Sequence, residues 1–174
     1  MKVGKYLLIL FFICCGCTSS LLKAPFAGPT IQYNVYVSKK FPPSVDKIIR
    51  NSFNEWQNKL QFLIQFDYKD GYIDCLQTTH AICIEPATPV ILQNRAGLTG
   101  HSDLLQHALI LISTDTYTSD MLVSIVSKHE IGHSIGLQHT EKHNTIMYCS
   151  GDFVSQTITN YDINSYLKKR NLVK

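Results

Sequence analysis

The sequence predicts a single domain of the α+β class, arranged as an α/β-type sandwich in which helices cover a β-sheet. Three observations lead to this prediction. The chain has 174 residues, of which 45% are hydrophobic and 17% charged, and this suits one domain with a substantial core. Some segments carry hydrophobic residues at alternate positions or in short apolar runs, which is typical of strands. Others carry them at every third or fourth position, as helices do.

The first predicted elements are a strand, a helix and a second strand. Residues 30–37 alternate between hydrophobic and polar side chains, which indicates a strand. Ser44 is expected to cap a helix. The apolar stripe of this helix, whose width suits packing against a sheet, comprises Val45, Ile48, Ile49, Phe53, Trp56 and Leu60. Residues 61–68 are predicted to form the second strand, because a turn sequence, Lys69-Asp70-Gly71, follows it.

Three further strands are predicted, over residues 81–85, 95–101 and 108–113. The glycines in the second of these favour a short edge strand that another backbone can approach. The third is a compact apolar run, which indicates burial on both faces of the sheet. The chain is therefore expected to contain about five strands.

Two more helices are expected in the second half of the chain. Thr118 or Ser119 is predicted to cap a helix over residues 120–136. Thr159 and Asp162 have the spacing of a capping box, which predicts a final helix. Together with the earlier helix, these give three helices.

The first seventeen residues have the pattern of a signal peptide. Lys2 and Lys5 precede an apolar run over residues 6–15, which is too short to span a bilayer comfortably. The run ends in a small residue followed by Cys17, as at a bacterial lipoprotein cleavage site. Residues 1–17 are therefore interpreted as a signal peptide in which Cys17 is a candidate for lipidation. Ordinary secretion is the alternative.

The remaining chain is interpreted as a tether over residues 18–29 and one domain over residues 30–174. Removal of Lys2 and Lys5 leaves fourteen basic and thirteen acidic residues, a net charge of +1. No basic stripe stands out, so nucleic acid is not expected as a partner. The leader predicts an extracytoplasmic protein, either secreted or lipid-anchored to a membrane surface, and we expect it to be a monomer.

Three cysteines lie beyond Cys17. In an oxidising compartment Cys75 and Cys83 are close enough in sequence to close a short loop, although three pairings are possible. That pairing would leave Cys149, which is interpreted as a small buried hydrophobic residue.

One stretch of eleven residues, from His129 to His139, carries the chemistry. His129 and His133 lie four residues apart, so that on a helix both imidazoles face the same way and can share a metal ion. Glu130 is placed beside the metal, where it can act as a base. Gly136 permits a turn that brings His139 round as a third ligand. Three neutral imidazoles leave a tetrahedral Zn²⁺ ion one open position, which a catalytic zinc requires.

Met147 follows this stretch after eight residues, and together they resemble the metzincin clan of zinc endopeptidases. In that clan a methionine turn lies below a three-histidine zinc site. The Met147-Tyr148 pair is most similar to the matrixins, the matrix metalloproteinase branch, and indicates a small, divergent member. The resemblance implies a metzincin-like catalytic domain with a twisted mixed sheet of about five strands, one of them an antiparallel edge strand, plus three helices.

Two functions are weighed. The first is a zinc-dependent endopeptidase in which Glu130 takes a proton from a zinc-activated water, and a peptide or protein substrate lies extended along the edge strand. The second is a secreted or surface-anchored binding lipoprotein with a mainly structural zinc. The presence of Glu130 favours the endopeptidase, because a structural site requires no base.

Overall fold

The computed structural model describes residues 29–71, 75, 78–93, 95–102, 107–149 and 157–173. Within these ranges the elements are β1 (Ile31–Val37), α1 (Pro43–Lys59), β2 (Ile64–Tyr68), β3 (Ala81–Ala87), β4 (Gly97–Ser102), β5 (His107–Ser113), the 3₁₀ helix η2 (Thr114–Thr118), α2 (Asp120–Ser134) and α3 (Asn160–Lys169). The predicted α+β class is confirmed. The predicted signal peptide, Cys17 and nearly all of the predicted tether lie outside the described residues.

The five named strands form one mixed sheet in the order β2-β1-β3-β5-β4. β1 pairs in parallel with β2 and β3, and β3 pairs in parallel with β5. β4 is antiparallel to β5 and lies at the edge, as the resemblance implied. Because β4 is an edge strand, its outer backbone groups are free to pair with another extended chain.

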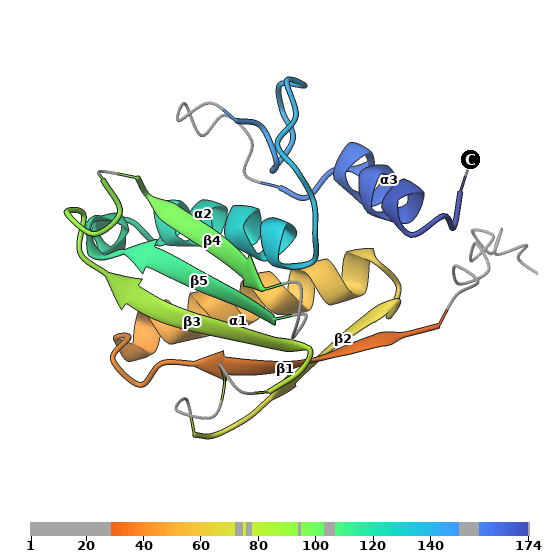
Figure 1. Cartoon of the computed structure of the whole chain (residues 1–174). Coiled ribbons are helices and arrows are strands. Elements are labelled where there is room, and N and C mark those ends of the chain that lie inside the picture. The colour runs from red at the N-terminus through yellow and green to blue at the C-terminus, as the bar shows by residue number, and fades with distance from the viewer. Residues whose placement is uncertain are drawn as a thin grey trace, which may run out of the picture.

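α1 and α2 pack side by side against one face of this sheet (Figure 1). The fully buried Trp56 of α1 joins the two helices, since its indole N–H donates to the carbonyl oxygen of Lys128 at 2.9 Å. The apolar stripe predicted for α1 therefore faces the core, as expected. α3 lies apart from this layer, beyond the end of the sheet (Figure 1).

The predicted beginnings of α1 and β2 are wrong, and the other predicted bounds of the strands and α2 differ from the observed ones by at most two residues. Ser44 does not cap α1; Pro42 is the N-cap, without a side-chain hydrogen bond, and Pro43 is the first helical residue. Proline suits that position because its fixed φ is helical and its missing N–H would have no partner there. The second strand begins only at Ile64, because Gln61 and Phe62 have positive φ angles of 51° and 64° and form a turn.

Among the cysteines beyond the leader, Cys75 and Cys83 form a disulfide, the pairing favoured by their proximity. The expectation that Cys149 is buried is wrong: its thiol is free and exposed. It lies two residues after the buried Met147, beyond the half-buried Tyr148, where the chain returns to the surface.

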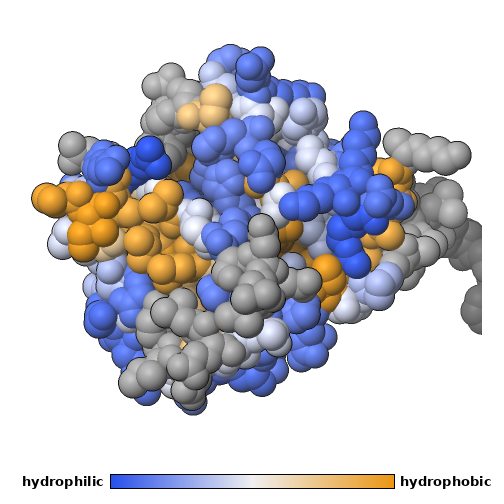
Figure 2. Space-filling model, viewed as in Figure 1, coloured by the Kyte–Doolittle hydropathy of each residue, from blue (hydrophilic) through white to orange (hydrophobic). Residues whose placement is uncertain are grey.

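An apolar patch lies over the loop between β3 and β4 and the beginning of α2 (Figure 2). Val90 and Ile91 of that loop are 84% and 66% exposed, and Met121 of α2 is 50% exposed. None of the helices in the described part of the chain has the length and apolar character needed to cross a membrane.

Candidate metal centre

α2 carries the first two predicted ligands, and the turn after its end positions the third, His139. The Ser119 side chain caps the helix by accepting from the N–H of Leu122. Gly136 has a φ of +96°, a left-handed conformation that side chains disfavour, and its N–H donates to the carbonyl of His133 at 2.7 Å. The Lys169 ammonium of α3 donates to the Gly136 carbonyl at 2.5 Å. The chain thus reverses direction at Gly136, and His139 comes to lie beside the two histidines of α2.

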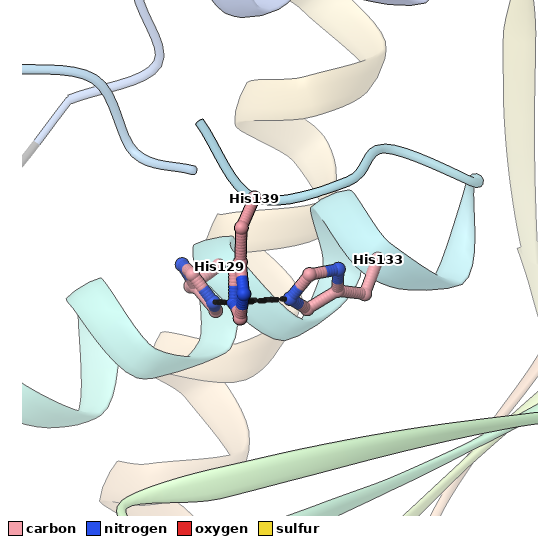
Figure 3. Close-up of side chains that lie close together, drawn as sticks. All are labelled: His129, His133 and His139. Atoms are coloured by element: carbon pink, nitrogen blue, oxygen red, sulfur yellow. Dashed lines mark hydrogen bonds between the residues drawn. The ribbon is translucent and has the colours of Figure 1, made fainter. Parts of the chain in front are cut away.

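The three imidazoles converge on one point (Figure 3). The Nε2 atom of His129 lies 3.1 Å from the Nε2 atoms of both His133 and His139, and the latter two are 3.0 Å apart. Tetrahedral zinc with nitrogen ligands at about 2.0–2.1 Å separates two ligand atoms by about 3.3–3.4 Å. The arrangement is therefore close to that of a three-histidine zinc site.

Hydrogen bonds on the far side of two rings decide which nitrogen faces the centre. His129 donates from Nδ1 to the carbonyl of Ile146 at 2.7 Å, and His133 donates from Nδ1 to the carbonyl of Leu137 at 2.9 Å. In the neutral imidazole the Nε2 atom then carries a lone pair and no proton. Two such lone pairs at 3.1 Å repel each other, whereas a cation between them attracts both, so the donor set fits a metal ion.

Burial favours the neutral form of these ligands. It lowers the pKa of His133 to about 4, against the opposing effect of the hydrogen bond to Leu137, and the neighbouring imidazoles lower that pKa further. Burial also lowers the pKa of His129. Since only a neutral imidazole binds a metal, the lowered pKa of each ring favours its binding-competent form.

Glu130 lies beside this cluster and is only 6% exposed. The Thr99 hydroxyl of β4 lies 2.6 Å from the carboxylate atom Oε2 and donates to it. Gly97 faces the same side chain so closely that a Cβ there would lie 2.7 Å from Oε1. Burial raises the pKa of Glu130 to about 7, although the Thr99 hydrogen bond and the charge of Arg95 lower it. A carboxylate with such a pKa can both accept and release a proton near neutral pH.

The sequence model of the matrixin family matches residues 27–166, which is most of the chain. The chain belongs to the matrixin family. The resemblance inferred from the eleven-residue stretch and Met147 is thus confirmed, and the chain is a member of a family of zinc metalloproteases.

Solved structures show the same fold for this matrixin at low sequence identity. Archaemetzincin from Methanopyrus kandleri is 12% identical with a TM-score of 0.51, and the match covers 83% of this chain and 97% of that chain. High choriolytic enzyme 1, a hatching enzyme zinc-protease from the medaka Oryzias latipes, is 10% identical with a TM-score of 0.57 and coverages of 84% and 94%. No curated protein matches the chain.

In this matrixin the predicted methionine turn lies against the zinc-site helix. Met147 is 2% exposed, and its Sδ atom is so close to Gly132 of α2 that no Cβ would fit there. Backbone bonds between Thr140 and Met147 and between Cys149 and Thr140 close the loop that directly follows His139. Asp162 of α3 accepts from the N–H groups of Ile146 and Met147, both at 3.4 Å.

The structure brings together the three predicted ligands, His129, His133 and His139, and packs Met147 against the same helix. Glu130 follows His129 on that helix and is bonded to Thr99 of β4. Sequence reasoning missed the support of Thr99 and Gly97 and the contact of Asp162 with the methionine turn. A signal for Asp162 existed, because its capping box with Thr159 is present as predicted. No local pattern pointed to the other two, since Thr99 precedes Glu130 by 31 residues.

Proposed function

We propose that this matrixin is a zinc-dependent endopeptidase with Glu130 as its general base and acid. His129, His133 and His139 would hold the zinc through their Nε2 atoms. The observation that carries the proposal is a buried carboxylate, hydrogen-bonded to the edge strand, beside three converging imidazoles. A site that held zinc only for stability would gain nothing from a buried acid, whose desolvation is costly.

Zinc, when bound, supplies a Lewis acid that polarises a carbonyl group and lowers the pKa of a water molecule. Glu130 is the group that moves protons. Thr99 occupies the carboxylate atom Oε2, so we assign Oε1 as the atom that takes a proton from the attacking water. The same atom then delivers that proton to the leaving amine of the cut peptide bond.

The substrate is proposed to lie extended along β4. The outer N–H and C=O groups of this edge strand are available for pairing, and Thr99 of the strand contacts Glu130. Backbone pairing would hold the peptide bond beside the three imidazoles, whatever side chains the substrate carries. Side-chain selection must then come from the surfaces on either side of the strand.

We also propose an extracytoplasmic location, either secreted or anchored through a lipid on Cys17. The support is the sequence of residues 1–17, with its two lysines, apolar run and terminal cysteine. Replacement of Cys17 by serine is expected to release an anchored protein from membranes into the soluble fraction. Release of the unchanged protein would instead favour secretion.

The endopeptidase proposal is tested with purified full-length protein. We expect about one zinc per chain, cleavage of a mixed peptide library, and loss of cleavage on chelation with recovery on adding zinc. Glu130→Gln is expected to keep the zinc and to lower kcat by at least about 10³-fold, because a proton-transfer group contributes 10²–10⁴-fold. Glu141→Gln, an exposed neighbour, is the matched control.

Two outcomes would contradict this proposal: protein without zinc, or cleavage by Glu130→Gln at the rate of the unchanged protein. The alternative, a binding lipoprotein with a mainly structural zinc, predicts zinc without any cleavage. In that case chelation would abolish partner binding only by unfolding the domain, which circular dichroism measures.

A further inference from the structure

A cleft of about 550 Å³ lies where β4 ends and where β1 and β5 begin. The C-terminal ends of α2 and α3 line its other side, and Figure 1 shows the end of α2 near the end of β4. Its lining includes His80, His101, His107, Gly136, Lys169 and Arg170. The volume is large enough to accept one or two side chains.

The lining is cationic. It contains Lys169, Arg170 and three histidines, but neither aspartate nor glutamate among the described residues. The Lys169 ammonium donates to the Gly136 carbonyl, and the Arg170 guanidinium donates to the carbonyls of Leu63 and Pro29 and to the Tyr166 hydroxyl. Within the described part of the chain, neither cation forms a salt bridge. Two charges bonded only to neutral oxygens favour an anionic ligand.

Histidine rings from the strands add donors to this lining. His101 near the end of β4 and His107 at the start of β5 both line the cleft. A histidine ring N–H can donate to a ligand oxygen. Polar groups thus come from the strands as well as from α3.

Two segments of the chain lead from the proposed active site to the cleft. On β4, Thr99 contacts Glu130, and His101 two residues later lines the cleft. After α2, Gly136 and Gln138 also line the cleft. Both lie in the sequence between the ligands His133 and His139. Two residues of extended chain span about 7 Å. A peptide on β4 with its scissile bond at the zinc ligands therefore reaches the cleft with a residue two or three positions away.

We propose that this cleft is a substrate subsite that binds the carboxylate of an aspartate or glutamate side chain, with Lys169 as its principal cation. The inference rests on the proposed peptidase function. Antiparallel pairing is the more stable arrangement at a strand edge, and it places the acidic residue on the N-terminal side of the cut bond. The protease would then select peptides with an acidic residue at this position, whereas backbone pairing to β4 alone would not distinguish acidic from neutral peptides.

The test uses full-length zinc-loaded protein and an alanine-rich decapeptide set in which one glutamate or one glutamine occupies each position in turn. We expect kcat/KM for the glutamate peptide to exceed that of its glutamine partner about fivefold or more at a single position N-terminal to the cut, the effect of a charge-assisted bond at a partly exposed site. Lys169→Glu should abolish or reverse this ratio. Lys168→Glu, the same charge change at the exposed neighbour outside the cleft, should leave it nearly unchanged.

Lys169→Gln is the second variant if Lys169→Glu does not fold, because it removes the charge and keeps a donor for the Gly136 carbonyl. Equal rates for glutamate and glutamine peptides at all positions, or equal losses in the Lys168 and Lys169 variants, would overturn the subsite. Binding of the labelled peptides to zinc-loaded Glu130→Gln, measured by fluorescence anisotropy, separates the two proposals. A glutamate preference in binding without cleavage by the unchanged protein would refute the peptidase and keep the subsite.

Discussion

Two residues of β4 fix the position of the Glu130 carboxylate. The Thr99 hydroxyl bonds the Oε2 atom, and the absence of a side chain at Gly97 makes room for the Oε1 atom. Neither residue contacts the imidazole cluster directly through any described bond, so each can be changed without removing a metal ligand. The effect of carboxylate position on the rate can therefore be measured while zinc binding is unchanged.

We predict that Thr99→Val lowers kcat about tenfold and changes KM little. The lost bond to a buried carboxylate is worth about 1.5 kcal/mol, which corresponds to roughly tenfold in rate. Steady-state kinetics on a single peptide measures both constants. Thr99→Ser retains the hydroxyl and should recover most of kcat, whereas a purely structural role would lower thermal stability in proportion to the rate.

A second prediction concerns the space beside the carboxylate. In Gly97→Ala the new Cβ would lie 2.7 Å from Oε1, 2.8 Å from Cγ of Glu130 and 2.9 Å from Cγ1 of Val126, so the carboxylate must move. We expect kcat/KM to fall at least about tenfold with an unchanged zinc content, because small displacements of a reacting group are costly. Gly100→Ala on the same strand is the control, since no atom lies within 4 Å of its Cβ.

At the scale of elements, α3 stabilises the methionine turn that packs against α2. Its Asp162 is 1% exposed and accepts from the Thr159 N–H at 2.8 Å and the Thr159 hydroxyl at 2.6 Å. The same carboxylate accepts from the backbone of the methionine turn. One buried carboxylate therefore fixes both the beginning of the helix and the turn that packs under α2.

We predict that Asp162→Asn destabilises the fold by about 2–3 kcal/mol. The amide keeps one acceptor oxygen, and its NH₂ group faces backbone donors that it cannot bond, so buried donors lose their partners. Urea unfolding monitored by circular dichroism gives the change in free energy. Asp115→Asn, an exposed first-turn residue of η2, should change it by less than about 0.5 kcal/mol. Equal effects of the two variants would contradict the bridging role of Asp162.

Most features with a local signal were predictable from the sequence, although the cap expected at Ser44 does not form. Features decided by distant contacts were not predictable. Ser119 and the Thr159–Asp162 pair cap their helices as predicted, because a cap involves residues only two or three positions apart. The positive φ angles of Gln61 and Phe62 left no such signal. The zinc ligands were predictable because helical spacing and one glycine turn decide their convergence. Their partner Thr99 comes from a different strand, where no spacing rule applies.

At the scale of the whole molecule, the site joins three parts of the chain: β4, α2 with its following loop, and α3. Contacts through Thr99, Met147 and Lys169 connect these parts within one sequence span of about seventy residues. The remaining strands and α1 supply the core on which α2 rests. Half-buried tyrosines on β1, β2 and η2 are expected to make the stability of the domain sensitive to pH.

Our last prediction is that the domain loses stability between about pH 10 and pH 12. Burial raises the pKa of Tyr33, Tyr68 and Tyr117 to about 12, against a usual value of 10.0. Above pH 10 the unfolded chain releases these protons before the folded chain does. The unfolded state then binds fewer protons, and the free energy of unfolding falls as pH rises. Below pH 10 both states keep the protons, and this contribution is constant.

Urea unfolding at intervals of half a pH unit from pH 8 to pH 11.5 measures this slope. Tyr33→Phe removes one of the buried hydroxyls with a raised pKa, so the decline should become shallower. Tyr161→Phe, at an exposed position, is the matched control and should leave the slope unchanged. A stability that stays constant from pH 9 to pH 11.5, or an equal change in both variants, would show that burial of these hydroxyls does not govern the alkaline limit.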